Sequence, residues 1–127
     1  MRIALADREA QLMEVLWDHG PSTVNEVQAH LADELAYTTV LTMLRKLEAK
    51  GYVGHAEEGR AHRYHALIQR TAAQQGALEA LVSRLFKGSQ EALLMHLVSR
   101  EKLSAAQVRR IEEHLRKHRK DDTKDGA

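Results

Sequence analysis

The chain has 127 residues, of which 29% are charged and 43% hydrophobic, as is typical of one globular domain or of one small domain with an appendage. Its net charge is +1, and it contains no cysteine, which excludes disulfides, thiolate metal sites and a cysteine nucleophile. No apolar run approaches the ~18 residues of a membrane span, and residues 1–18 lack the apolar block of a signal peptide. We therefore expect a soluble, cytoplasmic protein with no membrane insertion.

The near-zero net charge is an average over oppositely charged stretches. Residues 1–37 contain two basic and seven acidic residues, whereas residues 38–70 contain six basic and three acidic ones. Residues 71–127 carry eleven basic residues against eight acidic ones. The charge is therefore sorted along the chain and not absent, so the low net charge does not exclude a basic surface that binds nucleic acid.

Two helices are predicted in the acidic stretch. The first begins with Asp7 as its N-cap, shows apolar residues at helical spacing and ends before Gly20. Thr23 followed by Glu26 forms a capping box for the second helix. Its apolar stripe continues to Leu35, so we expect this helix to run over residues 23–35.

A third helix is predicted over about 37–50, and Gly51 closes it. Its polar side combines threonine hydroxyls with cations: Thr38, Thr39, Thr42, Arg45 and Lys46. In a helix-turn-helix, the second helix of the motif enters the major groove of DNA and its first residues meet base edges. Threonine hydroxyls and methyl groups can contact bases, and the cations can reach phosphates or guanine. The alternative is an ordinary solvated helix face.

The sequence pattern changes to a β-hairpin after Gly51. A strand from Tyr52 to Ala56, a turn at residues 57–60 and a second strand predict this hairpin. Three helices followed by a hairpin predict a mainly α fold with a winged helix-turn-helix. At the hairpin tip we expect Arg60 to contact DNA, with Arg63 behind it. The neighbouring glutamates favour the alternative of an ordinary charged turn.

The remaining residues are predicted to form helices and to pair with a second copy of the chain. We assign residues 1–70 to the winged helix, 71–118 to a helical dimerisation region and 119–127 to a charged flexible tail, with the last helix ending near Arg116. The middle helix, about 90–100, is apolar around most of its circumference, and some 50 residues are too few to bury it. The region could fold back on residues 1–70 or meet a second copy of the chain, and a symmetric homodimer is the commonest solution. The residues expected in the dimer contact are Leu78, Leu81, Val82, Leu85, Phe86, Leu93, Leu94, Leu97, Val98, Val108, Ile111 and Leu115.

The eight histidines raise the possibility of a metal site. His62 and His65 are three residues apart, so in a strand they point to opposite faces, while His114 and His118 lie one helical turn apart. A histidine pair needs further ligands to hold zinc, and no cysteine or obvious carboxylate completes either set. We expect no metal, no other cofactor and, in the absence of any catalytic motif, no enzyme activity.

The chain resembles the penicillinase-repressor family (BlaI, MecI and CopY) of winged-helix transcriptional repressors. The resemblance covers residues 5–115, and its motifs are more specific in the N-terminal half. They are Leu16-Trp17 before a glycine, Thr23–Val27, Tyr37–Leu44 through Leu47, Lys50-Gly51, Gly59-Arg60 with Tyr64, and Leu103-Ser104.

This resemblance implies a homodimer that binds double-stranded DNA at an inverted-repeat operator, commonly of TACA/TGTA type, next to resistance or stress genes. It implies DNA contacts by Thr38, Thr39, Thr42 and Lys46, and by Arg60 on the wing. Several members are inactivated when a membrane-sensor protease pathway cleaves the dimerisation region. The cleaved bond corresponds here to His96-Leu97, where the residues differ from the family's. The absence of cysteine excludes a copper sensor of the family's cysteine-rich kind.

Two other readings of the sequence remain open. The polar side of the third helix could dock a protein partner instead of DNA, and the acidic first helices favour this interpretation. Alternatively, the repressor could respond to a metal through its histidine pairs.

Overall fold

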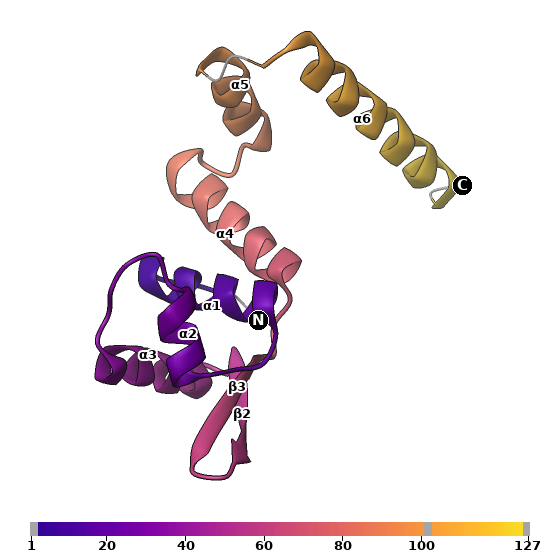
Figure 1. Ribbon diagram of the computed structural model, residues 1–127. Helices are drawn as coiled ribbons and strands as arrows, with labels where there is room; N and C mark the ends of the chain where they lie inside the picture. The colour runs from indigo at the N-terminus through magenta and orange to yellow at the C-terminus, as the bar shows by residue number, and fades with distance from the viewer. Residues whose placement is uncertain (1–2, 101–102, 126–127) are drawn as a thin grey trace. The chain divides into compact units, whose positions relative to one another are not determined.

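The computed structural model describes residues 3–100 and 103–125, with side chains described as far as residue 119 (Figure 1). The chain divides into two compact units, Met1–Leu81 and Val82–Ala127. The first contains α1 (Asp7–His19), β1 (Ser22–Thr23), α2 (Val24–His30), α3 (Tyr37–Ala49), β2 (Val53–Glu58), β3 (Ala61–Ala66) and most of α4 (Arg70–Leu85). The second contains the end of α4, α5 (Gln90–Arg100) and α6 (Ala105–Asp125). The expected mainly α winged helix-turn-helix is confirmed.

The core of the first unit is built from the apolar stripes of α1, α2 and α3 and from the sheet. Its fully buried side chains include Leu12, Met13, Val27, Val40, Leu44, Leu47, Val53 and Tyr64. The helical spacing of these residues brings one side of each helix inward. The opposite side of α3 is thereby left exposed.

The N-terminus of α1 is capped differently from the expectation. Asp7 is the first helical residue and Ala6 is the N-cap, so Asp7 as N-cap was wrong. The Glu9 side chain accepts a hydrogen bond of 2.9 Å from the Ala6 backbone N–H, one half of a capping box. Ala6 offers no side-chain acceptor to the first turn, so the carboxylate of Glu9 supplies the side-chain hydrogen bond at this end of the helix.

The second helix is shorter than the apolar stripe indicated. It ends at His30, and Leu31 already has an extended backbone with ψ of 140°. Leu31 and Leu35 still pack against the core, but from a loop. The expectation of a helix to Leu35 was wrong because side chains from an irregular segment filled the same apolar positions.

The three strands form an antiparallel sheet of order β1-β3-β2. In the chain, β1 precedes α2, and β2 and β3 follow α3. Ser22 in β1 pairs with Tyr64 in β3. We did not predict β1 from the sequence, because a strand of two residues is too short to show a pattern. The hairpin of β2 and β3, which we call the wing, is longer than expected: Glu57 and Glu58 belong to β2, not to the turn. The turn needs only two residues because Gly59 adopts a φ of +63°.

The start of α4 is attached to α1 by charged and aromatic contacts. The Arg70 guanidinium lies 2.8 Å from Glu14 and 2.5 Å from Asp18, and it sits over the Trp17 ring. The indole N–H of Trp17 donates to the Ile68 carbonyl at 2.9 Å. The helix begins at Arg70, one residue before the helical region predicted over residues 71–118.

The second unit contains one helical end that the sequence predicted incorrectly. Ser89 caps α5, and Ser104 and Gln107 form a reciprocal capping box at the start of α6. We expected α6 to end near Arg116, but it continues to Asp125, because charged residues such as Arg and Lys are good helix formers. Within the described residues, the helices are too short or too polar to cross a membrane.

Candidate nucleic-acid interface

The exposed side of α3 carries all five of its predicted site residues. Val40, Leu44 and Leu47 on the other side are fully buried, which fixes the rotation of the helix about its axis. The residues left exposed are Thr38, Thr39, Thr42, Arg45 and Lys46, which we call the reading face. A helix anchored on one side and polar on the other is suited to insertion into a groove of DNA.

The hydroxyl of Thr42 is already partly engaged. It donates a hydrogen bond of 2.8 Å to the backbone carbonyl of Thr38, one turn earlier. Its hydrogen is therefore directed into the helix, and its lone pairs and methyl group face outward. Thr42 can accept from an amino group of adenine or cytosine, or touch a thymine methyl.

Tyr37, the first residue of α3, was absent from the residues predicted to contact DNA. Its side chain is 44% exposed, in a chain with few aromatic residues. An exposed aromatic side chain at the start of α3 adds a flat apolar surface and a hydroxyl to the reading face. The sequence signal was present, since Tyr37 directly precedes the two threonines.

One edge of α3 faces the wing. Arg45 and Glu48 are three residues apart, and both interact electrostatically with the hydroxyl of Tyr64 in β3 and shift its pKa. Burial raises the pKa of Tyr64, the Glu48 carboxylate raises it further, and Arg45 lowers it. Tyr64 therefore packs where the wing meets this edge of α3.

The wing separates its two predicted arginines. Arg60 lies in the turn at the tip and is exposed, and it has no hydrogen bond or ion pair with the described side chains of residues 3–100 and 103–119. Its guanidinium is free to approach a phosphate or to enter a minor groove.

Arg63 lies on the other face of β3 from Tyr64 and is occupied by intramolecular partners. Its guanidinium contacts Glu58 at 2.5 Å, Glu26 at 3.2 Å and the Pro21 carbonyl at 3.1 Å. These hydrogen bonds raise the pKa of Arg63, with the bond to Glu58 as the main cause and that to Glu26 second. This arginine links the wing to α2 and the loop before it.

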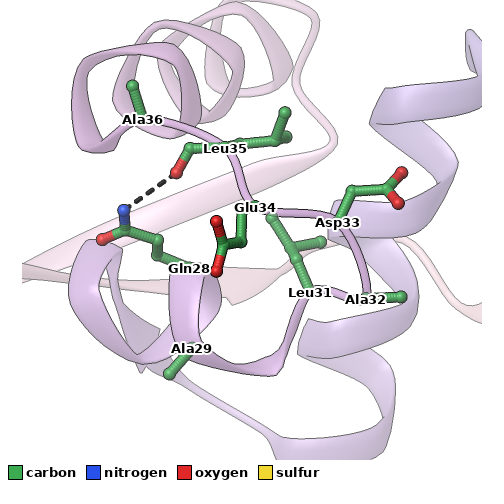
Figure 2. A pocket seen from close by; sticks show the side chains of 8 residues that line it. All are labelled: Gln28, Ala29, Leu31, Ala32, Asp33, Glu34, Leu35 and Ala36. Carbon is green, nitrogen blue, oxygen red and sulfur yellow. Dashed lines mark hydrogen bonds between the residues drawn. The ribbon is translucent and has the colours of Figure 1, made fainter.

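The loop between α2 and α3 holds the start of the reading face in place. The Gln28 side-chain amide donates a hydrogen bond of 2.8 Å to the Leu35 carbonyl, two residues before α3 (Figure 2). A shallow pocket surrounds this bond, lined by residues 28–29 and 31–36. Asp33 in the same loop pairs with Arg8 of α1 at 2.7 Å. The entry to α3 is thus fixed from both preceding helices.

Six of the eight histidines form three pairs, and among the described residues none of these pairs gathers the further ligands that a structural metal site requires. His55 and His62 stack on the wing, His19 stacks on His30, and the Nε2 atoms of His114 and His118 are 2.8 Å apart. Among the described residues, three or more histidine, cysteine or carboxylate side chains never gather around one point. These pairs provide two nitrogen ligands each, two short of a tetrahedral site.

The residues predicted for the dimer contact divide by exposure. Val82 is buried and Leu81, Phe86 and Leu93 are partly buried. The others are exposed by 39% to 73%: Leu78, Leu85, Leu94, Leu97, Val98, Val108, Ile111 and Leu115. The expected cleavage bond His96-Leu97 lies inside α5, and both of its side chains are exposed.

Three helices, a wing and an exposed polar third helix define a winged helix-turn-helix protein. The chain belongs to the penicillinase repressor family, whose model matches residues 5–117, and the resemblance drawn from its sequence motifs is confirmed. Membership in a family of transcriptional repressors makes the chain a transcriptional repressor and confirms the expectation that it is not an enzyme.

Individual relatives agree with this assignment. Over 100 residues the chain is 38% identical to the transcriptional regulator BlaI of Mycobacterium tuberculosis, covering 76% of this chain and 72% of that protein. Over 117 residues it is 25% identical to the penicillinase repressor of Bacillus licheniformis, covering 91% of each. The solution structure of the DNA-binding domain of the repressor BlaI matches 57% of this chain and 90% of its own, with 31% identity and a TM-score of 0.51.

Proposed function

We propose that the chain is a cytoplasmic, homodimeric repressor that binds an inverted-repeat operator in double-stranded DNA, next to resistance or stress genes. The observation that carries this proposal is the reading face, five exposed polar residues on a helix whose opposite side is completely buried. Thr38, Thr39, Thr42 and Lys46 would read or approach bases from the major groove, with Arg45 at the edge and Arg60 of the wing on a phosphate or minor groove. We assign Arg63 the supporting role of holding the wing.

Dimerisation is supported by the exposed apolar residues of α4, α5 and α6. Nine large apolar side chains among the described residues of these helices, the eight exposed residues of the predicted dimer contact and Met95, are at least 39% exposed in the single chain. Burial of each would contribute about 1–3 kcal/mol of stabilisation. Two reading faces held in one dimer would engage half-sites about 10 bp, or a multiple of that, apart. Linking the two binding events raises the affinity by about 10²-fold or more through effective concentration.

Relief of repression would follow from disruption of the dimerising helices, for which we propose a membrane sensor-protease pathway as partner. Cleavage of the exposed His96-Leu97 bond would detach α6, with Val108, Ile111 and Leu115, from the rest of the chain. A protease would first have to unwind α5 locally, since proteases bind extended chains. The residual fragment would keep its reading face but lose the second half-site.

A selection from a pool of randomised 30-bp duplexes tests the DNA-binding proposal. We expect the full chain to enrich an inverted repeat, and analytical ultracentrifugation to find two chains on each enriched duplex. Enrichment of a single half-site with one chain bound would contradict the dimer. If all duplexes bound equally or none bound, sequence-specific repression would be excluded and the reading face would be a protein-docking surface.

A second experiment tests relief by cleavage. Replacing residues 95–98 with the recognition sequence of a site-specific protease allows α5 to be cut in the purified protein. We expect cleavage to weaken binding to the enriched duplex by about 10²-fold. Unchanged affinity after complete cutting would contradict the proposed mechanism, and the uncut variant serves as the control for the substitution.

A further inference from the structure

Two histidines stack on the wing beside α3. The rings of His55 in β2 and His62 in β3 lie 4.3 Å apart with an interplanar angle of 9°. Both side chains reach solvent, with exposed fractions of 29% and 41%. We call this pair the histidine stack.

The strand register places the histidine stack on the wing face that meets α3. His55 is opposite Tyr64, and Glu57 is opposite His62. In an antiparallel pair, residues opposite each other share a face, and so do residues two apart in one strand. His55, Glu57, His62 and Tyr64 therefore share one face, and Tyr64 connects that face to the edge of α3 through Arg45 and Glu48.

A carboxylate of α3 points at the histidine stack. Glu48 Oε2 is 2.5 Å from Nδ1 of His55, and Glu57 Oε1 is 3.9 Å from Nε2 of His62. Glu48 is one turn after Arg45 of the reading face, so its negative charge lies where a DNA strand between the helix and the wing would pass. A carboxylate there repels phosphate unless a neighbouring cation neutralises it.

We propose that His55 and His62 belong to the DNA-binding surface, where the protonated histidine stack neutralises Glu48 and contacts a phosphate, coupling DNA affinity to pH. This inference rests on the proposed DNA-binding function and names a regulation of the same site. Histidine is the side chain whose charge changes between about pH 5 and 8. Among the described residues, the charged or titratable groups facing the stack are Glu48 and Arg45 from α3, Glu57 from β2, and the hydroxyl of Tyr64 from β3.

The sign of the pH effect follows from linkage. A phosphate close to the stack favours the protonated ring, so the complex binds more protons than the free protein and DNA. Affinity then rises as the pH falls, by at most about tenfold per pH unit for each proton taken up. Two positive rings face to face repel each other, so we expect uptake of about one proton per chain.

Fluorescence anisotropy at constant ionic strength tests this proposal. The probes are a labelled 30-bp duplex of random sequence at low salt and the duplex enriched in the selection. For the wild-type chain we expect the dissociation constant to be about fivefold or more higher at pH 8.0 than at pH 6.0. Calorimetry in buffers of different ionisation enthalpy should detect the proton taken up.

Three variants separate charge from structure. His55→Gln keeps a hydrogen-bond donor for Glu48 but cannot become charged, and we expect it and His62→Gln to lose most of the pH dependence. Glu48→Gln removes the repelling charge, so it should strengthen binding at pH 8.0 and flatten the profile. A merely structural role of Glu48 would not produce tighter binding. Urea unfolding at both pH values checks that each variant is folded.

His65→Gln is the matched control, since His65 is in β3 like His62 but lies on the opposite face of the wing. We expect it to retain the wild-type pH dependence. If the double variant His55→Gln/His62→Gln kept the full pH dependence, or if Glu48→Gln weakened binding at both pH values, the inference would be overturned. Failure to enrich an inverted repeat contradicts the proposed operator instead, and absence of binding to both duplexes contradicts both proposals.

Discussion

Lys50, at the end of α3, binds Glu9 in the first turn of α1, with its Nζ 2.9 and 2.8 Å from the two carboxylate oxygens. Glu9 is only 4% exposed, so this ion pair lies at the border of the core. It joins the beginning of the first helix to the end of the helix that carries the reading face. The same carboxylate caps α1 through the Ala6 N–H, and one buried group thereby positions two helices.

Replacement of Glu9 by Gln should destabilise the fold in a pH-dependent way. Burial opposes ionisation of Glu9, but the hydrogen bonds from Lys50 and the Ala6 N–H outweigh it, so its pKa lies below the ordinary value. Its stabilising effect is therefore complete above the unfolded-state pKa of about 4.3 and is lost as the pH falls through the lower folded-state value. Urea unfolding should show a loss of about 2 kcal/mol for Glu9→Gln at pH 7, shrinking towards pH 3. An equal loss at both pH values would contradict this assignment.

Replacement of Gln28 by Met should disturb the entry to the reading face more than the stability of the fold. The variant keeps the side-chain length but removes the hydrogen bond to the Leu35 carbonyl, at a cost of about 1 kcal/mol. Binding to the enriched duplex should weaken more than binding to a random duplex, because base contacts depend on exact placement. Gln74→Met, on the exposed surface of α4, is the control. Equal weakening for both duplexes would show that Gln28 does not position α3.

Thr39→Ala and Arg60→Ala should affect different properties of DNA binding. Loss of a base contact at Thr39 should reduce discrimination between the enriched and random duplexes by about 1 kcal/mol. Loss of a phosphate contact at Arg60 should weaken both complexes and reduce the slope of log affinity against log salt by about 1. Anisotropy titrations between 50 and 200 mM salt, a range within which about 10³-fold changes are common, measure both quantities. Arg84→Gln is the control for net charge, and the reverse pattern would exchange the two assigned roles.

Substitution of exposed apolar residues by glutamate should yield a monomer. Leu94 in α5 is 48% exposed and Ile111 in α6 is 40% exposed, so neither substitution removes a core side chain of the single chain. In a dimer contact, each would bury a carboxylate without a partner. Light scattering after size exclusion should give the mass of one chain for Leu94→Glu and for Ile111→Glu, and of two chains for the wild type. Gln107→Glu is the matched control, and a dimeric mass for all variants would exclude these helices from the interface.

The local pattern of the sequence was sufficient for the elements whose apolar spacing and end signals agree. Gly51 after α3 and the 3.6-residue spacing of Val40, Leu44 and Leu47 are short-range features, and they placed α3 with its polar face outward. The penicillinase repressor family was likewise identified from short local motifs in the sequence. Where an apolar stripe continued through a loop, as from Leu31 to Leu35, spacing alone led to a helix that is not formed.

Contacts between distant parts of the chain could be known only from the fold. Glu9 and Lys50 are 41 residues apart, and Arg63 is 37 residues from Glu26, so no spacing rule connects them. The sequence predicted the hairpin and identified His62 and His65 in its second strand. The register of the strands sets which side chains share a face of the hairpin. The packing of that face against α3 then places His55 beside Glu48. Patterns within one element follow from backbone periodicity, whereas the pairing of charges depends on how elements pack.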